Sequence, residues 1–418
     1  MKRVSRKWWL VLFAIPIIPL LYLAYLQLLF EVRLNSLRAA GDPTSIADVE
    51  RIARSSVDVD CTSLWQQAMQ AYSEDWGRLS EEDLKAYLAL PCIDCGSPIP
   101  RAGTAWPELP VAIRCLKSQS RALELSKEAA ANGGKAWLPR DRGAYDFGMM
   151  KGRSDHRMLC WLTELQATVE LYQQQPDKAA QSIDVLFALA RAVENQPTVN
   201  DALLANKYEW ASFRLIGELC SQESVSPEML GRLQDYLSGL DLLNRFHGAL
   251  QAEQAYAIEL YFRPLWPPIL PYLSERLNYL DAMNAFIQYV SEGWPTALNY
   301  GTTKPHTAAG PLTELAINSY QRMLRSAARV ETNRRMTIVA IAARRFIADK
   351  NQTPASIDEL IPQYLPTRPT DVWGNDTMRL SINDHEVVVL CQGFGKPTEQ
   401  KEGNLEEIKL GFELPVAR

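Results

Sequence analysis

Residues Trp8 to Phe30 form an unbroken run without an ionisable side chain. A membrane helix needs roughly 20 apolar residues to cross the hydrocarbon core, so this run is long enough for one crossing. Signal peptides have shorter apolar centres, of roughly 7 to 15 residues, followed by small residues at the cleavage site. The end of the run, Leu23 to Gln27, lacks that pattern. We therefore expect an uncleaved transmembrane anchor over residues 8–30.

Basic residues precede the run and determine its expected orientation. The stub over residues 1–7 has no acidic residue and contains Lys2, Arg3, Arg6 and Lys7. Because cytoplasmic flanks of membrane helices carry an excess of Lys and Arg, we expect this stub to remain in the cytoplasm. The rest of the chain is then exported. The predicted location is the inner (cytoplasmic) membrane, with a single pass and with the bulk in the periplasm or cell exterior.

Composition describes an ordinary folded protein outside the anchor. Hydrophobic residues make up 47% and charged residues 22% of the 418 residues, which argues against a disordered or multi-span chain. Without the four basic residues of the stub, 40 Lys and Arg (44 − 4) stand against 49 Asp and Glu, a net charge of −9. An acidic chain repels phosphates, so nucleic acid is not an expected partner. The expected partners are the membrane and proteins of the cell envelope.

Helical periodicity dominates residues 31–331. Between Asp155 and Leu240 apolar residues recur at helical spacing, which predicts four helices joined by short turns. Asp177 to Ala180 is similar to the hairpin step of tetratricopeptide-like repeats, although no period of about 34 residues recurs. Longer helices are expected from about Val111 to Ala131 and from about Leu312 to Lys350. The expected fold class is mainly α, with an irregular array of helical hairpins.

The final residues, 332–418, follow a different pattern. Ser356 to Glu359 has the order of a capping box, which predicts a short helix. The period then switches to two, which predicts three strands at about 378–382, 387–391 and 408–414. We expect a small C-terminal α+β module in which a three-stranded antiparallel sheet packs on the preceding long helix.

Four segments of this module carry a family resemblance. In chain order they are Ala342 to Phe346, Asn351 to Leu360, Tyr364 to Pro366 and Pro369 to Asn375. Together they resemble the C-terminal headgroup of the type II secretion major pseudopilins, and the Trp373-Gly374-Asn375 step is the most specific part. The order of anchor, helical array and headgroup-like end is similar to a set of uncharacterised bacterial membrane-anchored exported proteins. The resemblance implies a headgroup-like fold for the module and supplies no activity.

The seven cysteines include a lone Cys-x-x-Cys motif at Cys92 and Cys95. A zinc site needs a second pair of ligands, and none of the four histidines has companion spacing. We therefore expect no metal and no other cofactor. Because exported proteins fold in oxidising surroundings, disulfides are expected among Cys61, Cys92, Cys95 and Cys115.

Basic residues gather in the long helix near the C-terminus. Seven arginines lie between Arg322 and Arg345, with Glu331 and Asp349 as the nearby acids. Such a helix either docks an acidic partner or lipid headgroups, or pairs with the acidic remainder of the body. The alternative to a partner-binding role for Trp373 is a core position beside Phe346. The candidate partner-binding residues are Arg322, Arg325, Arg329 and Trp373.

The sequence contains no complete catalytic set. Asp155-His156 and Asp384-His385 are adjacent pairs without a Ser or Cys in a nucleophile turn nearby, so surface or capping positions are expected for both histidines. The pattern favours a non-catalytic, membrane-tethered scaffold or protein-interaction protein of the bacterial cell envelope. The alternative is an exported hydrolase or ligand-binding protein that uses the 132–154 loop, with the acids Asp141, Asp146 and Asp155.

Overall fold

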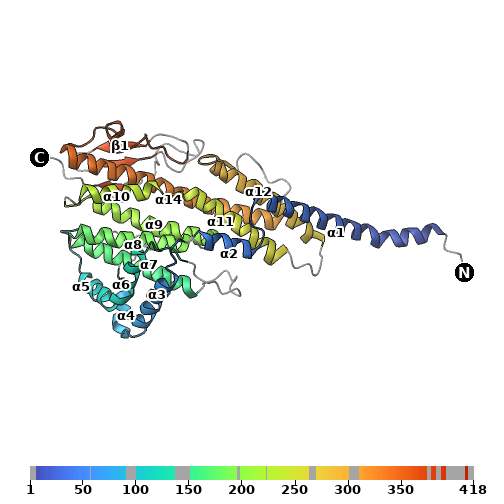
Figure 1. Cartoon of the computed structure of the whole chain (residues 1–418), viewed down its shortest axis with the longest axis horizontal. Helices are drawn as coiled ribbons and strands as arrows, with labels where there is room; N and C mark the ends of the chain where they lie inside the picture. Colours follow the sequence, from blue (N-terminus) through green and yellow to red (C-terminus); the bar gives the residue numbers. More distant parts are fainter. Residues whose placement is uncertain are drawn as a thin grey trace. The chain divides into compact units, whose positions relative to one another are not determined.

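Helices make up most of the computed structural model of the chain, and a small antiparallel sheet lies near the C-terminus (Figure 1). The predicted mainly α class is confirmed. Side chains before Ile17 lie outside the description. The structure describes residues 6–56, 58–90, 100–136, 151–194, 198–222, 224–262, 270–300, 310–373, 378–382, 387–391 and 410–412.

The chain divides into two compact units that interleave along the sequence. The first unit contains Met1–Ile52, Pro197–Val199 and Leu243–Arg325, and the second contains Ala53–Gln196, Asn200–Leu242 and Ser326–Arg418. The long helix α14 (Pro311–Lys350), which matches the prediction, therefore contributes residues to both units. Local periodicity carries no signal of this division, because it reports on single elements and not on their partners.

The first unit is built from helices. They are α1 (Arg6–Ala40), most of α2 (Ile46–Ser55), α11 (Leu242–Ala257) with a π-helical turn at Ile258–Phe262, α12 (Leu270–Ser291), a 3₁₀ turn at Thr296–Asn299 and the start of α14. One face of α1 is buried and has α12 as its main neighbour. Its buried residues, spaced three or four apart as on a single helix face, are Leu26, Phe30, Leu34 and Leu37. Among the described residues, no helix is both long and apolar enough to cross a membrane.

Arg276 of α12 fixes α1 in place. It is 1% exposed, and its Cζ lies 4.0 Å from the ring centroid of Phe30. One guanidinium nitrogen donates to the carbonyl oxygen of Phe262 at 3.0 Å, and another donates to Oε1 of Gln27. A buried charge is stable only where such contacts replace its water. The contacts of Arg276 therefore hold α1 and α12 in one relative position.

Helix α1 ends at a glycine turn that leads into α2. Gly41 follows α1 with a φ of +85°, a conformation that glycine adopts without strain. Ser45 then caps α2, because its Oγ accepts from the backbone N of Asp48 at 3.2 Å and donates to Oδ2 of Asp48 at 2.8 Å. This hydrogen bond is the largest cause of the lowered pKa of Asp48.

The second unit holds the remaining elements. They are α3 (Thr62–Trp76), α4 (Glu81–Leu88), α5 (Leu109–Ser118), α6 (Ser120–Ala131), α7 (Lys151–Tyr172), α8 (Pro176–Glu194), α9 (Val199–Cys220), α10 (Pro227–Ser238), the rest of α14, a 3₁₀ turn at Ile357–Leu360, and the strands β1 (Arg379–Ile382), β2 (Val387–Leu390) and β3 (Leu410–Phe412). The four helices predicted between Asp155 and Leu240 are confirmed as α7 to α10.

One predicted helix is divided. The sequence predicts a single helix from Val111 to Ala131, but α5 and α6 meet at Gln119, whose φ of −106° and ψ of 16° leave the helical region. The side chain of Gln119 is fully buried. Because Gln119 is neither Gly nor Pro, the sequence carries no usual signal for this break.

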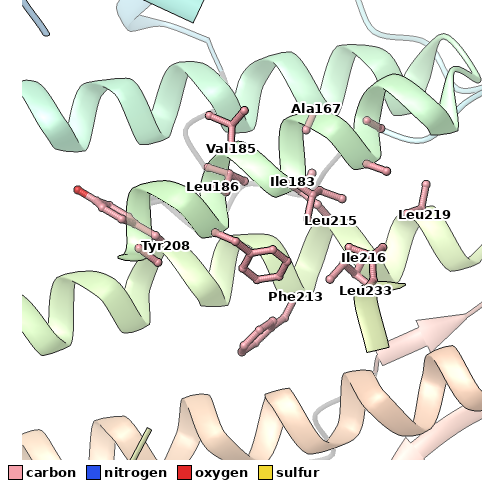
Figure 2. Packing of buried hydrophobic residues seen from close by; sticks show 14 of the residues in the cluster. Ala167, Ile183, Val185, Leu186, Tyr208, Phe213, Leu215, Ile216, Leu219 and Leu233 are labelled. Atoms are coloured by element: carbon pink, nitrogen blue, oxygen red, sulfur yellow. The ribbon is translucent and has the colours of Figure 1, made fainter. Parts of the chain in front are cut away.

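Helix α8 lies at the centre of the second unit. Of its 19 residues, 13 are buried. Val185 to Ala190 are buried without interruption, so neighbouring elements surround this part of the helix, whereas Asp177, Lys178 and Gln181 near its start are exposed. Figure 2 shows Ile183 and Leu186 of α8 and Leu215 of α9 among the side chains that fill the layer between the helices, and all three are 0% exposed.

The turn from Asn132 to Lys135 joins three elements of this unit. Gly133 and Gly134 have φ values of +97° and +76°, so both suit glycine. The indole nitrogen of Trp65 donates to the carbonyl oxygen of Gly134 at 2.8 Å. The backbone N of Cys61 donates to the carbonyl oxygen of Lys135 at 2.8 Å. The turn therefore attaches the start of α3 to the end of α6. It also lies against α8, because a Cβ added to Gly134 would lie 2.6 Å from that of Ala188.

The predicted small antiparallel sheet is confirmed. β1 pairs with β2, and Leu380 lies opposite Val389. β3 pairs with the other side of β2. Val387 and Val389 share the core of the second unit with Met336 of α14. The sheet therefore packs on the long helix, as expected.

The capping box predicted at Ser356 is wrong. Ser356 makes no side-chain cap bond and precedes a single 3₁₀ turn, Ile357–Leu360. The carboxylate of Glu359 instead accepts from the backbone N of Ala355 at 2.9 Å. A 3₁₀ turn is sufficient here because it places residues three apart on the same side, and both Ile357 and Leu360 are buried.

Replacing Gly134 by alanine should destabilise the protein more than replacing Gly133. Both glycines have positive φ, so either alanine costs about 1 to 2 kcal/mol in backbone strain. Only at Gly134 does the new Cβ meet a neighbour, and overpacking of this kind adds about 1 to 3 kcal/mol. Urea unfolding of both variants measures the difference. Equal losses would contradict the close approach of this turn to Ala188.

Candidate functional site

The N-terminal part of α1 exposes an apolar surface. Six large apolar side chains from Ile17 to Tyr25 are 45% to 65% exposed. Single exposed apolar residues are normal on a folded protein, whereas a contiguous set marks a surface that contacts something other than water. We refer to this set as the apolar segment of α1. Its residues are Ile17, Ile18, Leu20, Leu21, Tyr22 and Tyr25.

One face of α1 becomes buried directly after the apolar segment. Leu26 and Phe30 are 5% and 1% exposed, and Gln27 is bound by Arg276, whereas Leu28 on the other face is 62% exposed. Leu26 and Phe30, which belong to the predicted anchor, therefore lie in the core of the first unit. The predicted anchor starts at Trp8, whose side chain lies outside the described residues.

Two of the cysteines expected in disulfides have free thiols. Cys61 and Cys115 are buried and are not bonded to each other. Cys92 and Cys95 lie outside the described residues, so a disulfide between these two stays a prediction. Burial raises the pKa of the Cys115 thiol to about 12. Since the thiolate is the reactive form, this cysteine is chemically inert at neutral pH.

His156 is not at the surface, contrary to expectation. Its side chain is 1% exposed, its Nδ1 lies 3.2 Å from the Tyr208 hydroxyl, and the two rings stack with centroids 5.5 Å apart. The indole of Trp65 lies on it with centroids 5.9 Å apart. Burial lowers the pKa of His156 from 6.5 to about 3, so the imidazole is neutral at physiological pH. Asp141 and Asp146 of the 132–154 loop, and the side chain of Asp155, lie outside the described residues.

A cleft of about 160 Å³ lies between α7 and α9. The contact of His156 with Tyr208 joins positions 52 residues apart, and that of Leu171 with Gln222 joins positions 51 residues apart. Because this separation stays nearly constant along both helices, α7 and α9 run parallel. Sequence reasoning missed this cleft, since its lining comes from two helices that share no motif. The lining residues are Arg157, Cys160, Trp161 and Glu164 of α7 and Lys207, Tyr208, Trp210 and Ala211 of α9.

A second pocket, of about 430 Å³, lies at the C-terminal ends of the same two helices. Across it Arg101 and Glu218 approach to 3.6 Å. Its other lining residues are Pro100, Ala102, Leu171, Gln174, Ser221, Gln222 and Ser224. The lining is polar and carries one ion pair, without the aromatic side chains of the α7–α9 cleft.

Several arginines of α14 pair within the second unit. Glu331 is 3% exposed and accepts from Nε of Arg334 and Nε of Arg335, each at 2.7 Å. Arg335 also donates to the carbonyl oxygen of Thr370 at 2.8 Å. Arg345 donates to Oε1 of Gln234 at 2.9 Å. These arginines are therefore held within the second unit by Glu331 of the same helix and by neutral carbonyl and amide oxygens, and pairing with acidic residues in the rest of the body stays a prediction.

The predicted partner-binding residues are not brought into one described site. Arg322, Arg325 and Arg329 are exposed on α14. Trp373 is half-buried, and its backbone N donates to Oδ1 of Asp371 at 2.9 Å. The ring that packs edge-on against Phe346 is that of Tyr364, with centroids 5.7 Å apart. Both roles considered for Trp373 stay predictions.

Within the described ranges, no three His, Cys, Asp or Glu residues converge as a metal site. Comparison of the chain with protein-family models, curated proteins and solved structures gave no match. The resemblance to pseudopilin headgroups therefore stays a prediction.

Stability should fall as the pH falls below 6.5, because of His156. The pKa of His156 is 6.5 in its ordinary state and about 3 in the folded protein. At a pH between these two values, the imidazole of His156 is protonated in the unfolded chain and neutral in the folded chain. The free energy of unfolding then drops by up to about 1.4 kcal/mol per pH unit, or about 2 kcal/mol between pH 7 and pH 5. Urea unfolding across this range measures the slope. The control, His156→Gln, should have a shallower slope, and identical slopes would rule out a buried neutral imidazole.

Proposed function

We propose that the protein is a membrane-tethered scaffold of the bacterial cell envelope, anchored in the lipid bilayer by the N-terminal end of α1. The apolar segment of α1 carries this proposal. Apolar surface in water costs roughly 25 cal/mol per Å², and insertion into a bilayer removes that cost. A charge-free helix whose side chains are exposed over several consecutive positions is suited to lipid on all sides.

The proposed anchor runs from Trp8 to Tyr25. These 18 residues (25 − 8 + 1) contain no ionisable side chain. A helix of this length rises about 27 Å, close to the roughly 30 Å of a hydrocarbon core. The limit at Tyr25 replaces the predicted limit at Phe30, because Leu26 and Phe30 are buried in the first unit. The basic stub then lies in the cytoplasm, and the bulk of the chain is exported.

Two features support a scaffold role for the exported bulk. Its second unit is an array of helical hairpins around α8, an architecture that offers broad surfaces to partner proteins. The first-unit part of α14 exposes Arg322 and Arg325, and its second-unit part exposes Arg329; such basic side chains are suited to an acidic partner. The headgroup-like fold of residues 332–418 is part of the same proposal.

Substituting the apolar segment should release the protein from membranes. Charged residues at the centre of a membrane helix cost about 2.5 to 3.5 kcal/mol each, so Leu20→Glu/Leu21→Glu should weaken association with phosphatidylglycerol vesicles by at least 100-fold. Vesicle flotation of the full chain measures this. The matched control is Leu315→Glu, at an apolar residue of α14 that is 63% exposed, and it should float like the unsubstituted protein. Flotation of the double variant would overturn the proposed anchor.

Orientation should follow the basic stub. Alkaline phosphatase fused after Arg418 should be active in a bacterial host, because this enzyme folds only after export. Replacing Lys2, Arg3, Arg6 and Lys7 by Gln removes the charge bias and should lower that activity. A reporter that is active only in the cytoplasm should be silent at the same position. The reverse pattern would refute export of the folded bulk.

A further inference from the structure

We propose that the cleft between α7 and α9 binds a short linear zwitterion, a molecule with a carboxylate at one end of an apolar chain and an ammonium group at the other. The cleft lies wholly within the second unit. The proposal goes beyond the membrane tether and does not rest on it. It depends on the order in which charged and aromatic side chains follow one another along the two helices.

The cleft is positive at one end. Because α7 and α9 run parallel with an offset of 51 to 52 residues, Lys207 lies level with positions 155 and 156 of α7 (207 − 52 and 207 − 51). It is therefore beside Arg157, and both side chains line the cleft. A guanidinium binds a carboxylate through two parallel hydrogen bonds, and a neighbouring ammonium adds charge. This end is suited to the carboxylate of the ligand.

The opposite end is negative. Glu164 lines the cleft seven residues after Arg157, which is about 10 Å along the axis of α7. Glu164 is 4% exposed. Attraction between charges is stronger where water is displaced, so an ammonium group gains more beside this carboxylate than it would at the surface. The ligand therefore needs its two charges at separate ends.

The middle of the cleft is aromatic and apolar. Trp161 and Tyr208 line it together with Trp210, which is 37% exposed and marks the open side. Indole and phenol rings cover a methylene chain and attract an adjacent ammonium group. His156 supports Tyr208 from behind as a neutral ring, so it adds no further charge.

The size of the cleft limits the ligand to a small molecule. Its volume of about 160 Å³ is close to the roughly 150 Å³ of a cavity that holds benzene. A folded partner segment would not fit in that space. A chain of five or six carbons with charged ends matches this volume.

Calorimetric titration of the full chain in detergent with 6-aminohexanoate tests the proposal. One molecule should bind per chain, at least tenfold more tightly than hexanoate or hexylamine, because each of these lacks one charge-assisted contact. Glycine, in which the same two charged groups are adjacent, should also bind at least tenfold more weakly. Absence of saturable binding, or equal binding of hexanoate, would overturn the proposal.

Variants locate the site. Lys207→Gln and Trp210→Ala should each weaken 6-aminohexanoate binding by at least tenfold, whereas Lys178→Gln, an exposed position of α8 outside the cleft, should leave it unchanged. Glu164→Gln should abolish the preference over hexanoate, a change of specificity that a loss of structure does not produce. Circular dichroism melting shows whether each variant is folded. Binding that persists in the folded Lys207→Gln and Trp210→Ala variants would place the ligand elsewhere and refute the proposal.

Discussion

The burial of α8 from Val185 to Ala190, six residues in a row, is the constraint on which the second unit depends. Five of its alanines, Ala179, Ala180, Ala188, Ala190 and Ala192, are 0% exposed. Such small side chains allow neighbouring backbones to come close, and the turn at Gly134 uses this space against Ala188. The helices before and after α8, namely α7 and α9, both run opposite to it and hence parallel to each other. Their register brings Arg157 beside Lys207, so the charge order of the cleft follows from the packing of α8.

Burial also determines the chemistry of the groups around that core. Trp65 donates to the Gly134 carbonyl and covers His156, and the same burial keeps the imidazole neutral. Glu331 remains in the interior because two arginines on its own helix replace its water. In both cases a polar side chain is tolerated because neighbouring groups satisfy or neutralise it. Removing one of these neighbours would therefore leave a buried polar group without compensation.

The sequence predicts elements whose signals are local. The four helices between Asp155 and Leu240 and the strands β1 and β2 depend on the spacing of near neighbours. The division of the predicted helix at Gln119 and the missing cap at Ser356 do not depend on near neighbours. Both depend on tertiary packing. The cleft was beyond prediction for the same reason. Its two walls are about 50 residues apart in sequence, and neither wall alone has a motif.

The contact of Arg276 with α1 determines where we propose that the anchor ends. By hydropathy, Leu26 to Phe30 continues the apolar run. Arg276, which changes the surroundings of this segment, lies 249 positions from Gln27 in the sequence. A guanidinium in the hydrocarbon core costs several kcal/mol, so the turn of α1 that binds Arg276 is stable in protein and unfavourable in lipid. Since Gln27 and Phe30 hold that guanidinium, the proposed anchor has to end before them. Leu26 is buried and directly follows Tyr25, so no flexible linker separates the proposed anchor from the packed part of α1.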